Sequence, residues 1–252
     1  MSPNIAFIMG TAGSGKTVLT AVLKKVLDKR GVDVVCVNLD PAVKDIPYPA
    51  DVDVREWVSI DDLIEEYSLG PNGAIVASAD LVASHVHEIK EEINDLGADA
   101  VLVDTPGQLE VFVYRSSGPL IVNYFKDELT AGLFLFDSSL MVDRAVNYVS
   151  LSLLAFSTIF RVNLPLINVL TKVDLIGDDQ LEKITRWSES TEGLMDDVPP
   201  GPISDYALTM TETLRSFETT FPLIPASALK EDGIIEIVAE LSRIWQRGDD
   251  WL

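Results

Sequence analysis

A glycine-rich loop between a predicted strand and a predicted helix constrains the fold of this chain more than any other feature. Residues 10–17 read Gly-Thr-Ala-Gly-Ser-Gly-Lys-Thr and match the phosphate-loop pattern G-x-x-x-x-G-K-[ST], between an apolar run at 4–9 and a helical pattern at 16–30. The glycines allow backbone N–H groups to point at phosphate oxygens, and the helix adds its positive N-terminal end. A glycine-rich turn without function is the alternative, which the complete pattern in this context disfavours. We expect phosphate contacts from Gly10, Thr11, Ala12, Gly13, Ser14, Gly15, Lys16 and Thr17.

Two side chains of this loop have specific expected roles. We expect Lys16 to reach the β- and γ-phosphates and the Thr17 hydroxyl to bind Mg²⁺. A nucleoside triphosphate with Mg²⁺ is therefore the expected ligand. The loop alone does not distinguish GTP from ATP, because ATPases, kinases and GTPases share it.

Apolar runs without polar alternation recur between helical patterns along the whole chain. Such runs are typical of strands buried on both faces, so we predict a three-layer α/β/α domain with a mostly parallel central sheet. We expect one domain over 1–252, with a helical insertion at 178–221. The predicted strands are 4–9, 33–39, 100–104, 132–137, 165–170 and 222–225. The predicted helices outside the insertion are 16–30, 60–67, 76–96, 120–128, 143–160 and 233–246.

The charge of the chain limits its possible partners. The net charge is −21, which repels polyanions and anionic membranes, so we expect no nucleic-acid partner and no membrane partner. No apolar run approaches the roughly 20 residues that span a bilayer, and no signal peptide is expected at the N-terminus. Cys36 is the one cysteine, which excludes an intrachain disulfide and fits a reducing cytosol. We therefore expect a cytoplasmic protein.

An aspartate at the end of the strand at 100–104 is the second candidate site residue. Residues 101–107 read Val-Leu-Val-Asp-Thr-Pro-Gly, and an acid that ends an apolar strand beside a phosphate loop is typical of a magnesium ligand. We expect Asp104 to hold Mg²⁺ through a water and Gly107 to offer its N–H to the γ-phosphate. Gln108 follows directly and is expected to orient the attacking water. Without the phosphate loop, a turn residue would be the better interpretation of Asp104.

A second aspartate ends the strand at 33–39. Residues 38–42 read Asn-Leu-Asp-Pro-Ala. Ligands of open α/β sheets lie at the carboxyl ends of the strands, so Asp40 is expected at the same edge as the phosphate loop. It could bind the Mg²⁺ shell or polarise the attacking water, and a turn aspartate before a proline remains the alternative.

The end of the strand at 165–170 indicates which base is bound. Residues 168–174 read Asn-Val-Leu-Thr-Lys-Val-Asp, which resembles the guanine-binding [NT]KxD motif of GTPases. The Asp174 carboxylate can accept hydrogen bonds from guanine N1–H and the exocyclic amine, and adenine offers neither. The Lys172 stem can lie over the base, and Thr171 stands where many GTPases have Asn, so selectivity rests more on Asp174. The expected base contacts are Thr171, Lys172, Asp174, Ser227, Ala228 and Leu229, the last three in a loop that follows the strand at 222–225.

A Gly-Pro-Asn sequence at 70–72 completes the set of motifs. By local rules it is only a turn between two helices. Together, however, GTAGSGKT, NLDPA, LGPNGA, DTPGQLE, TKVD and SAL occur in an order that resembles the GPN-loop GTPases, on the archaeal side of that family. The resemblance covers residues 5–245 and is weakest across 178–221.

The resemblance implies several properties that the residues alone do not. Members are dimerising P-loop GTPases with an all-parallel sheet, so a homodimer is expected. Gly70, Pro71 and Asn72 would reach across the dimer to the partner's phosphates. Asp40 would be the first-switch acid, and Gln108 would belong to the second switch. Eukaryotic members help to assemble RNA polymerase II, from which we take only an unknown protein client.

Three functions remain open at this point. A Mg²⁺-dependent GTPase switch, with Lys16, Asp40, Asn72 and Gln108 as its catalytic residues and Thr17, Asp40 and Asp104 as its metal ligands, is the leading one. An ATP-driven partitioning ATPase or a small-molecule kinase would share the phosphate loop, but Asp174 argues against both. A scaffold that binds nucleotide without hydrolysing it would not need Gln108, Asn72 or Asp40.

Overall fold

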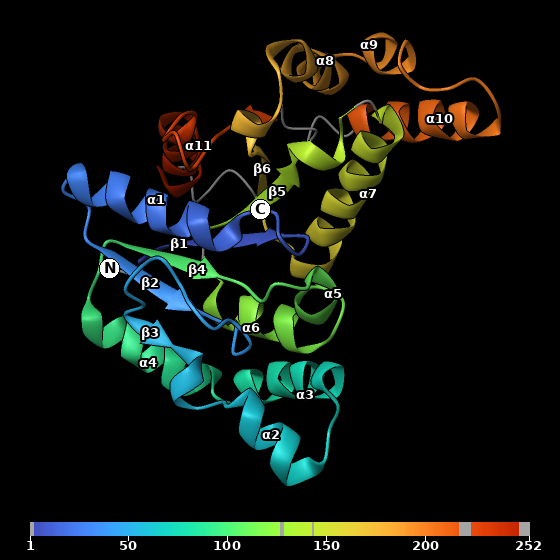
Figure 1. Cartoon of the computed structure of the whole chain (residues 1–252). Helices are drawn as coiled ribbons and strands as arrows, with labels where there is room; N and C mark the ends of the chain where they lie inside the picture. The colour runs from blue at the N-terminus through green and yellow to red at the C-terminus, as the bar shows by residue number, and fades with distance from the viewer. Residues whose placement is uncertain (1–2, 127–128, 143, 217–222, 247–252) are drawn as a thin grey trace.

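A parallel sheet forms the centre of the computed structural model, which describes residues 3–126, 129–142, 144–216 and 223–246 (Figure 1). Within these residues the sheet has seven strands in the order β3-β2-β4-β1-β5-β6-β7, and every neighbouring pair is parallel. The predicted three-layer α/β/α class with a mostly parallel sheet is confirmed. The strands are β1 (Asn4–Gly10), β2 (Val34–Asn38), β3 (Val52–Asp53), β4 (Ala100–Asp104), β5 (Thr130–Asp137), β6 (Leu166–Thr171) and β7 (Ile224–Pro225).

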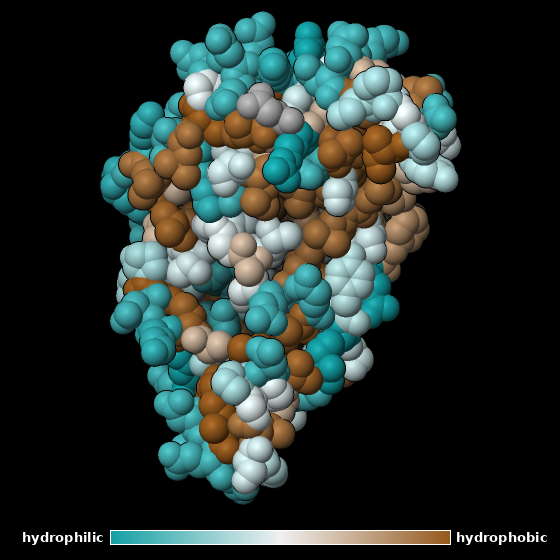
Figure 2. All heavy atoms as spheres, turned by 45° about the vertical axis from the view of Figure 1, so that its right-hand side comes forward, coloured by the Kyte–Doolittle hydropathy of each residue, from teal (hydrophilic) through white to brown (hydrophobic). Residues whose placement is uncertain are grey.

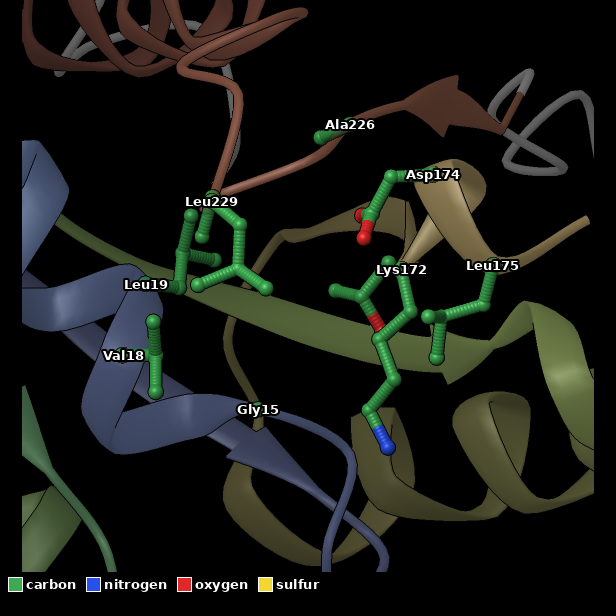
Figure 3. Close-up of a pocket in the computed structure, with 10 residues that line it drawn as sticks. Gly15, Val18, Leu19, Lys172, Asp174, Leu175, Ala226 and Leu229 are labelled. Carbon is green, nitrogen blue, oxygen red and sulfur yellow. The ribbon is translucent and has the colours of Figure 1, made fainter.

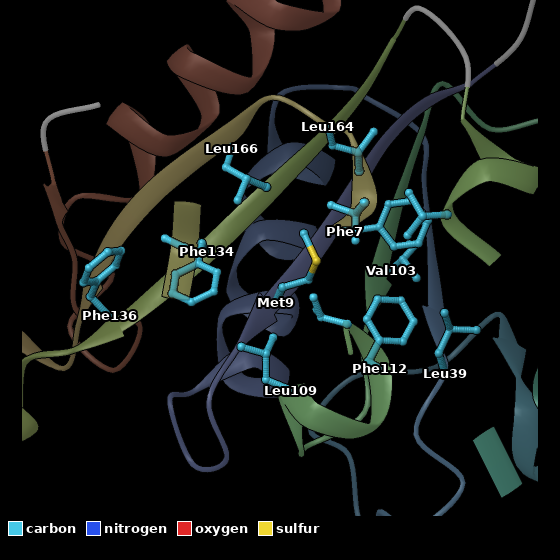
Figure 4. Close-up of a cluster of buried hydrophobic side chains, with 14 of the residues drawn as sticks. Phe7, Met9, Leu39, Val103, Leu109, Phe112, Phe134, Phe136, Leu164 and Leu166 are labelled. Carbon is cyan, nitrogen blue, oxygen red and sulfur yellow. The ribbon is translucent and has the colours of Figure 1, made fainter. Parts of the chain in front are cut away.

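The strands are apolar throughout because each face of the sheet meets its own layer of helices. Along β1, Phe7 and Met9 point into one apolar core, and Ala6 and Ile8 point into the other. Figure 4 shows the first of these cores, where Phe7 and Met9 lie near Phe112 on one face of the sheet. Side chains on both faces of the sheet are therefore buried, so polar and apolar residues do not alternate along such a strand.

Helices cover both faces of the sheet. On one face α1 and α11 pack together against the sheet, and on the other lie α3 to α7 (Figure 1). The helices before the insertion are α1 (Lys16–Lys29), α2 (Ile60–Tyr67), α3 (Pro71–Ser84), α4 (Val86–Leu96), α5 (Leu109–Phe112), α6 (Ser117–Phe125) and α7 (Ala145–Val162). The remaining helices are α8 (Asp178–Glu189), α9 (Thr191–Met195), α10 (Pro202–Ser216) and α11 (Ile234–Gln246).

The predicted helical insertion corresponds to α8, α9 and α10, which pack on one another and on α7. A buried tryptophan organises it: the Trp187 indole N–H donates to Asp197, which also pairs with Arg186. Arg215 of α10 donates to the backbone carbonyl of Trp187 and so joins the third helix to the first. The last residues of the predicted insertion, 217–221, lie outside the described residues.

The segment at 70–96 differs from the sequence-based expectation. A single helix over 76–96 was expected after a Gly-Pro-Asn turn, but α3 already begins at Pro71, and α4 follows after a break at His85. Proline suits the first turn of a helix, where its fixed φ is helical and its missing N–H has no acceptor. The Gly-Pro-Asn sequence is therefore the start of a helix, not a turn between helices.

Several shorter differences have local causes. The short strand β3 and the one-turn helix α5 have no pattern of their own, because tertiary contacts decide such short elements. The helix predicted at 120–128 begins earlier, at Ser117. Its predicted last residues, 127–128, lie outside the described residues. The same holds for residue 143, where the predicted helix 143–160 starts, and for residue 222, where the predicted strand 222–225 starts.

Among the described residues, α7 is the one helix that is long and apolar enough to cross a bilayer by length and composition. One third of its residues are buried, and α7 contacts α6, α8, α10 and β6. Core helices of globular proteins meet the same criterion, so this finding assigns no membrane segment.

Candidate functional site

Most of the predicted site residues converge at the carboxyl edge of the sheet. Gly10 ends β1, Asp104 ends β4, Asp40 lies two residues beyond β2, and Lys172 follows β6. These strands are neighbours around β1, so their ends meet at one edge. The sheet order thus explains why motifs separated by more than 160 residues of sequence form one site.

The phosphate loop has a backbone shape that only glycine adopts easily. Gly13 and Gly15 have φ values of 76° and 96°, in the left-handed region. Gly15 is also the residue from which α1 begins, so the N–H groups of the first helical turn are directed into the loop. The hydroxyl oxygens of Thr11 and Ser14 are buried and have no hydrogen-bond partner in the described structure. Such orphaned polar atoms fit a loop that closes around phosphate oxygens.

Lys16 is buried across the mouth of this loop. Its ammonium donates to the carbonyl oxygens of Gly10, Thr11 and Gly107, at 3.0, 3.1 and 3.1 Å. Burial lowers the pKa of Lys16, and the charges of Asp104 and Asp40 oppose that shift. The amine therefore already lies between the phosphate loop and Gly107, where a β- or γ-phosphate would be bound.

Asp104 is buried and has one free oxygen. Its Oδ2 accepts a hydrogen bond of 3.0 Å from the Tyr48 hydroxyl, and its Oδ1 has no partner in the described structure. Burial raises the pKa of Asp104 to about 6, although the nearby hydroxyls of Thr17 and Tyr48 and the charge of Lys16 favour the carboxylate. The hydroxyl of Thr17 and the free carboxylate oxygen are hard donors of the kind that Mg²⁺ prefers, so these residues fit that ion.

Asp40 connects the segments that follow β2 and β4. Its Oδ2 accepts from the Gly107 N–H at 2.9 Å, and its Oδ1 accepts from the Ala42 N–H at 2.9 Å. Asn38 fixes the backbone here, because its side chain accepts from the Asp40 N–H at 3.0 Å and donates to the Asp40 carbonyl at 3.2 Å. The N–H that was expected to meet the γ-phosphate is therefore bonded to Asp40 in this structure. Gln108 lies beside it, exposed, as the residue before α5.

An ion pair behind this strand end holds the position of Asn38. Asp53 accepts from the Asn38 amide at 2.9 Å and from Arg55, whose guanidinium also donates to the carbonyls of Val43 and Lys44. Burial acts to raise the pKa of Asp53, but the hydrogen bonds from Arg55 and Asn38 outweigh it and lower the pKa. This network was not predicted from the sequence, since it depends on β3 lying beside β2.

A cavity of about 250 Å³ lies beside the phosphate loop, where the base was expected. Figure 3 shows Asp174 with its carboxylate directed into the space that Val18 of α1 and Leu229 bound on the other side. Asp174 Oδ1 accepts a hydrogen bond of 2.6 Å from the Ser227 hydroxyl. An acceptor held at the end of an apolar slot is the arrangement that discriminates bases by their donors. The cavity is lined by Gly15, Val18, Leu19, Thr171, Lys172, Asp174, Leu175, Ala226, Ala228 and Leu229.

The strand end at Thr171 links the base cavity to the phosphate loop. The Thr171 hydroxyl donates to the carbonyls of Ser14 and Phe136, at 2.8 and 3.2 Å. Lys172 follows with a left-handed φ of 60°, and its ammonium pairs at 2.6 Å with the buried carboxylate of Asp137. Asp137 was missed from the sequence, although it ends β5 just as Asp104 ends β4, and this position was a usable signal.

Three of the expected contact residues are not at this site. Gly70, Pro71 and Asn72 are an exposed start of α3, and within the described part of the chain they make no hydrogen bond to residues 10–17. Figure 1 places α3 below the sheet, away from the loop between β1 and α1. Their approach to a partner's phosphates stays a prediction.

Comparison with known proteins gives matches over nearly the whole chain. A family model described as conserved hypothetical ATP binding protein matches residues 8–247. The chain is 29% identical to GPN-loop GTPase 3 of Eremothecium gossypii, over 96% of this chain and 92% of that protein. It is 33% identical to GPN-loop GTPase 3 of Saccharomyces cerevisiae, over 71% of this chain and 67% of that protein. For GPN-loop GTPase 1 of Dictyostelium discoideum it spans 59% of the relative's length.

The fold comparison agrees with the sequence comparison. The crystal structure of a GTPase in its apo form from Pyrococcus abyssi superposes with a TM-score of 0.83 at 28% identity, over 98% of this chain and 99% of that one. The description of the family model refers to ATP, whereas the named relatives are GTPases, and the acceptor at Asp174 suits guanine rather than adenine. The family that the resemblance indicated is therefore confirmed, and the chain belongs to the GPN-loop GTPases.

Proposed function

We propose that this chain is a Mg²⁺-dependent enzyme that binds GTP, hydrolyses it to GDP and phosphate, and acts as a switch on a protein client. One observation carries the proposal: Asp174 is held by Ser227 at a cavity that Thr171 ties directly to the phosphate loop. Guanine specificity and phosphate binding therefore belong to a single continuous site.

The chain's own residues have separate tasks in this proposal. Lys16 would bind oxygens of the β- and γ-phosphates. The carbonyls of Gly10 and Gly107 already hold its ammonium at the phosphate loop. Thr17 and Asp104 would hold Mg²⁺, together with Asp40 once its carboxylate is released from a backbone N–H, and the bound ion would offset the charge of the phosphates. Gln108 directly follows Gly107 and would orient the attacking water, and an Asp40 carboxylate released by the Gly107 N–H could accept a hydrogen bond from that water.

The base is tested by competition between nucleotides. We expect fluorescent GDP to bind at least 100-fold more tightly than fluorescent ADP, since an adenine leaves the acceptor at Asp174 without its donors. Equal affinities for the two nucleotides would contradict the GTPase proposal and favour the ATP-driven alternatives. Asp61→Asn, in an exposed carboxylate of α2, is a control that should leave both affinities unchanged.

We propose a homodimer as the working form. Asn72 is exposed at the start of α3, and large apolar side chains are exposed on elements near it. Those of the neighbouring elements include Tyr114, Leu153 and Phe160. Figure 2 shows apolar surface gathered on the side of the molecule that faces right in Figure 1. Extended apolar surface of this kind marks interaction sites, and the RNA polymerase role of eukaryotic relatives suggests that a protein client is a further candidate for it.

The dimer proposal predicts complementation between two inactive variants. Asn72→Ala keeps its own phosphate loop, and Lys16→Ala keeps Asn72, so a mixture of the two should recover up to about half of the hydrolysis rate per mixed dimer. Asn94→Ala, at an exposed position of α4, should retain full activity alone. If Asn72→Ala is inactive alone and no recovery occurs while mixed dimers are present, Asn72 acts within its own subunit.

A further inference from the structure

Tyr48 is a buried tyrosine whose hydroxyl ends on the carboxylate of Asp104. It lies in the segment between β2 and β3, its ring packs in the apolar core on the α1 side of the sheet, and 6% of the residue is exposed. The hydroxyl donates to Asp104 Oδ2 at 3.0 Å. A protonated phenol donates one hydrogen bond, and here that donor is directed at the Asp104 carboxylate.

The hydrogen bond divides the two oxygens of Asp104. Oδ2 is occupied by Tyr48, whereas Oδ1 is buried and has no partner in the described structure. A buried carboxylate with one fixed oxygen cannot rotate freely about its last bond. The oxygen that remains is then presented in one orientation, and its lone pairs are free for a cation or a cation-bound water.

We propose that Tyr48 is the positioning residue for Mg²⁺ in this site, because it fixes the orientation of Asp104 and leaves Oδ1 for the ion or its water. This inference rests on the Mg²⁺ role in the proposed function and adds a residue to it. Hydrogen-bond partners of metal ligands orient the ligand, and their removal typically lowers metal affinity by about 10–100-fold.

The position of Tyr48 also connects Asp104 to Asp40. Both Tyr48 and Asp40 belong to the segment that leaves β2, and Arg55 fixes the part between them through the carbonyls of Val43 and Lys44. Asp51 fixes the far end, where its carboxylate accepts from the Cys36 N–H at 2.8 Å. The tyrosine is therefore held from both sides, as a positioning role requires.

The test measures Mg²⁺ binding rather than hydrolysis. Fluorescent GDP is titrated into wild type and Tyr48→Phe at Mg²⁺ concentrations from micromolar to 10 mM. We expect the Mg²⁺ concentration at half-maximal enhancement of GDP binding to rise about tenfold in Tyr48→Phe. GDP affinity in EDTA should stay within twofold of wild type, since the ring and the phosphate loop are unchanged. Tyr124→Phe, which loses a phenol contact to His87 on the α4–α6 surface, is the matched control and should behave as wild type.

Two results would overturn the inference. One is an unchanged Mg²⁺ midpoint in Tyr48→Phe while wild type shows clear Mg²⁺ dependence. The other uses 4-aminophenylalanine at position 48, which keeps a hydrogen-bond donor at the same place. This variant should restore the wild-type Mg²⁺ midpoint. A midpoint like that of Tyr48→Phe would show that hydrogen-bond donation is not the cause. If wild type itself shows no Mg²⁺ dependence, the Mg²⁺ role in the proposed function fails first.

Discussion

Replacing Asp174 by asparagine changes one atom of the base cavity and should change which base is bound. The asparagine has nearly the same size, so the cavity walls at Val18 and Leu229 can remain in place. It keeps one acceptor oxygen, which can take the Ser227 hydroxyl or the guanine N1–H. Its amide group is a donor, and it would face the guanine amine, which is also a donor.

The size of the loss follows from the two hydrogen bonds to guanine. Hydrogen bonds to a charged group contribute about 1.5–3 kcal/mol each, so the pair contributes about 3–6 kcal/mol. One acceptor survives in Asp174→Asn, so we expect a loss near the lower value, about 3 kcal/mol or roughly 100-fold in affinity for GDP. Xanthine carries a carbonyl in place of the amine and should bind the asparagine better than guanine does.

The assay is displacement of fluorescent GDP by GDP and by xanthosine diphosphate. Asp178→Asn, an exposed carboxylate at the start of α8, is the control and should leave both affinities unchanged. The reasoning is refuted if Asp174→Asn binds GDP within threefold of wild type, or if GDP remains preferred over xanthosine diphosphate by the wild-type ratio.

Three further changes have expected outcomes. Ser227→Ala removes the 2.6 Å hydrogen bond that orients Asp174, and GDP should bind about tenfold less tightly in the same displacement assay; unchanged affinity would contradict that role. Gly132→Ala places a Cβ about 2.3 Å from Leu166 Cδ2 in the core, so urea unfolding should show a loss of about 1–3 kcal/mol, and full stability would contradict the packing. Burial raises the pKa of Cys36 to about 12 from its ordinary value of 9.0, so its thiol should react with a disulfide reagent at pH 8 only on unfolding. Because the unfolded thiol ionises first, the stability that Cys36 contributes is complete below pH 9.0 and is lost as the pH rises toward about 12, and rapid labelling of the native protein would contradict this burial.

Much of the fold follows from local pattern, because the strands are buried on both faces. The run from Asn4 to Gly10 has side chains in two different apolar cores, and a sequence of that kind has few alternatives once a phosphate loop follows it. The positions of the phosphate loop and of the base motif could also be predicted from the sequence, because each motif is one contiguous segment that directly follows a strand. Helix boundaries were less predictable, as the break at His85 shows, since α3 and α4 are both helix-forming and only their packing separates them.

The rest of the site depends on contacts between distant segments. Tyr48 reaches Asp104 across 56 residues of sequence, and no spacing rule connects them. The pairing of Lys172 with Asp137 joins the ends of two neighbouring strands, and it could be inferred only after the strand order was known. Asn72 is a different case, because its predicted partner lies outside a single chain.

The hydrogen bond between Asp40 and the Gly107 N–H has a consequence for how a third phosphate would be sensed. One donor serves one strong acceptor at a time, and Asp40 holds that donor at 2.9 Å in the described structure. A γ-phosphate that took the Gly107 N–H would displace Asp40 in the same event, and so would set free the carboxylate. A diphosphate lacks the oxygen that makes this exchange. Recognition of the triphosphate and release of Asp40 would then be one event, in which the Gly107 N–H exchanges the Asp40 carboxylate for the γ-phosphate.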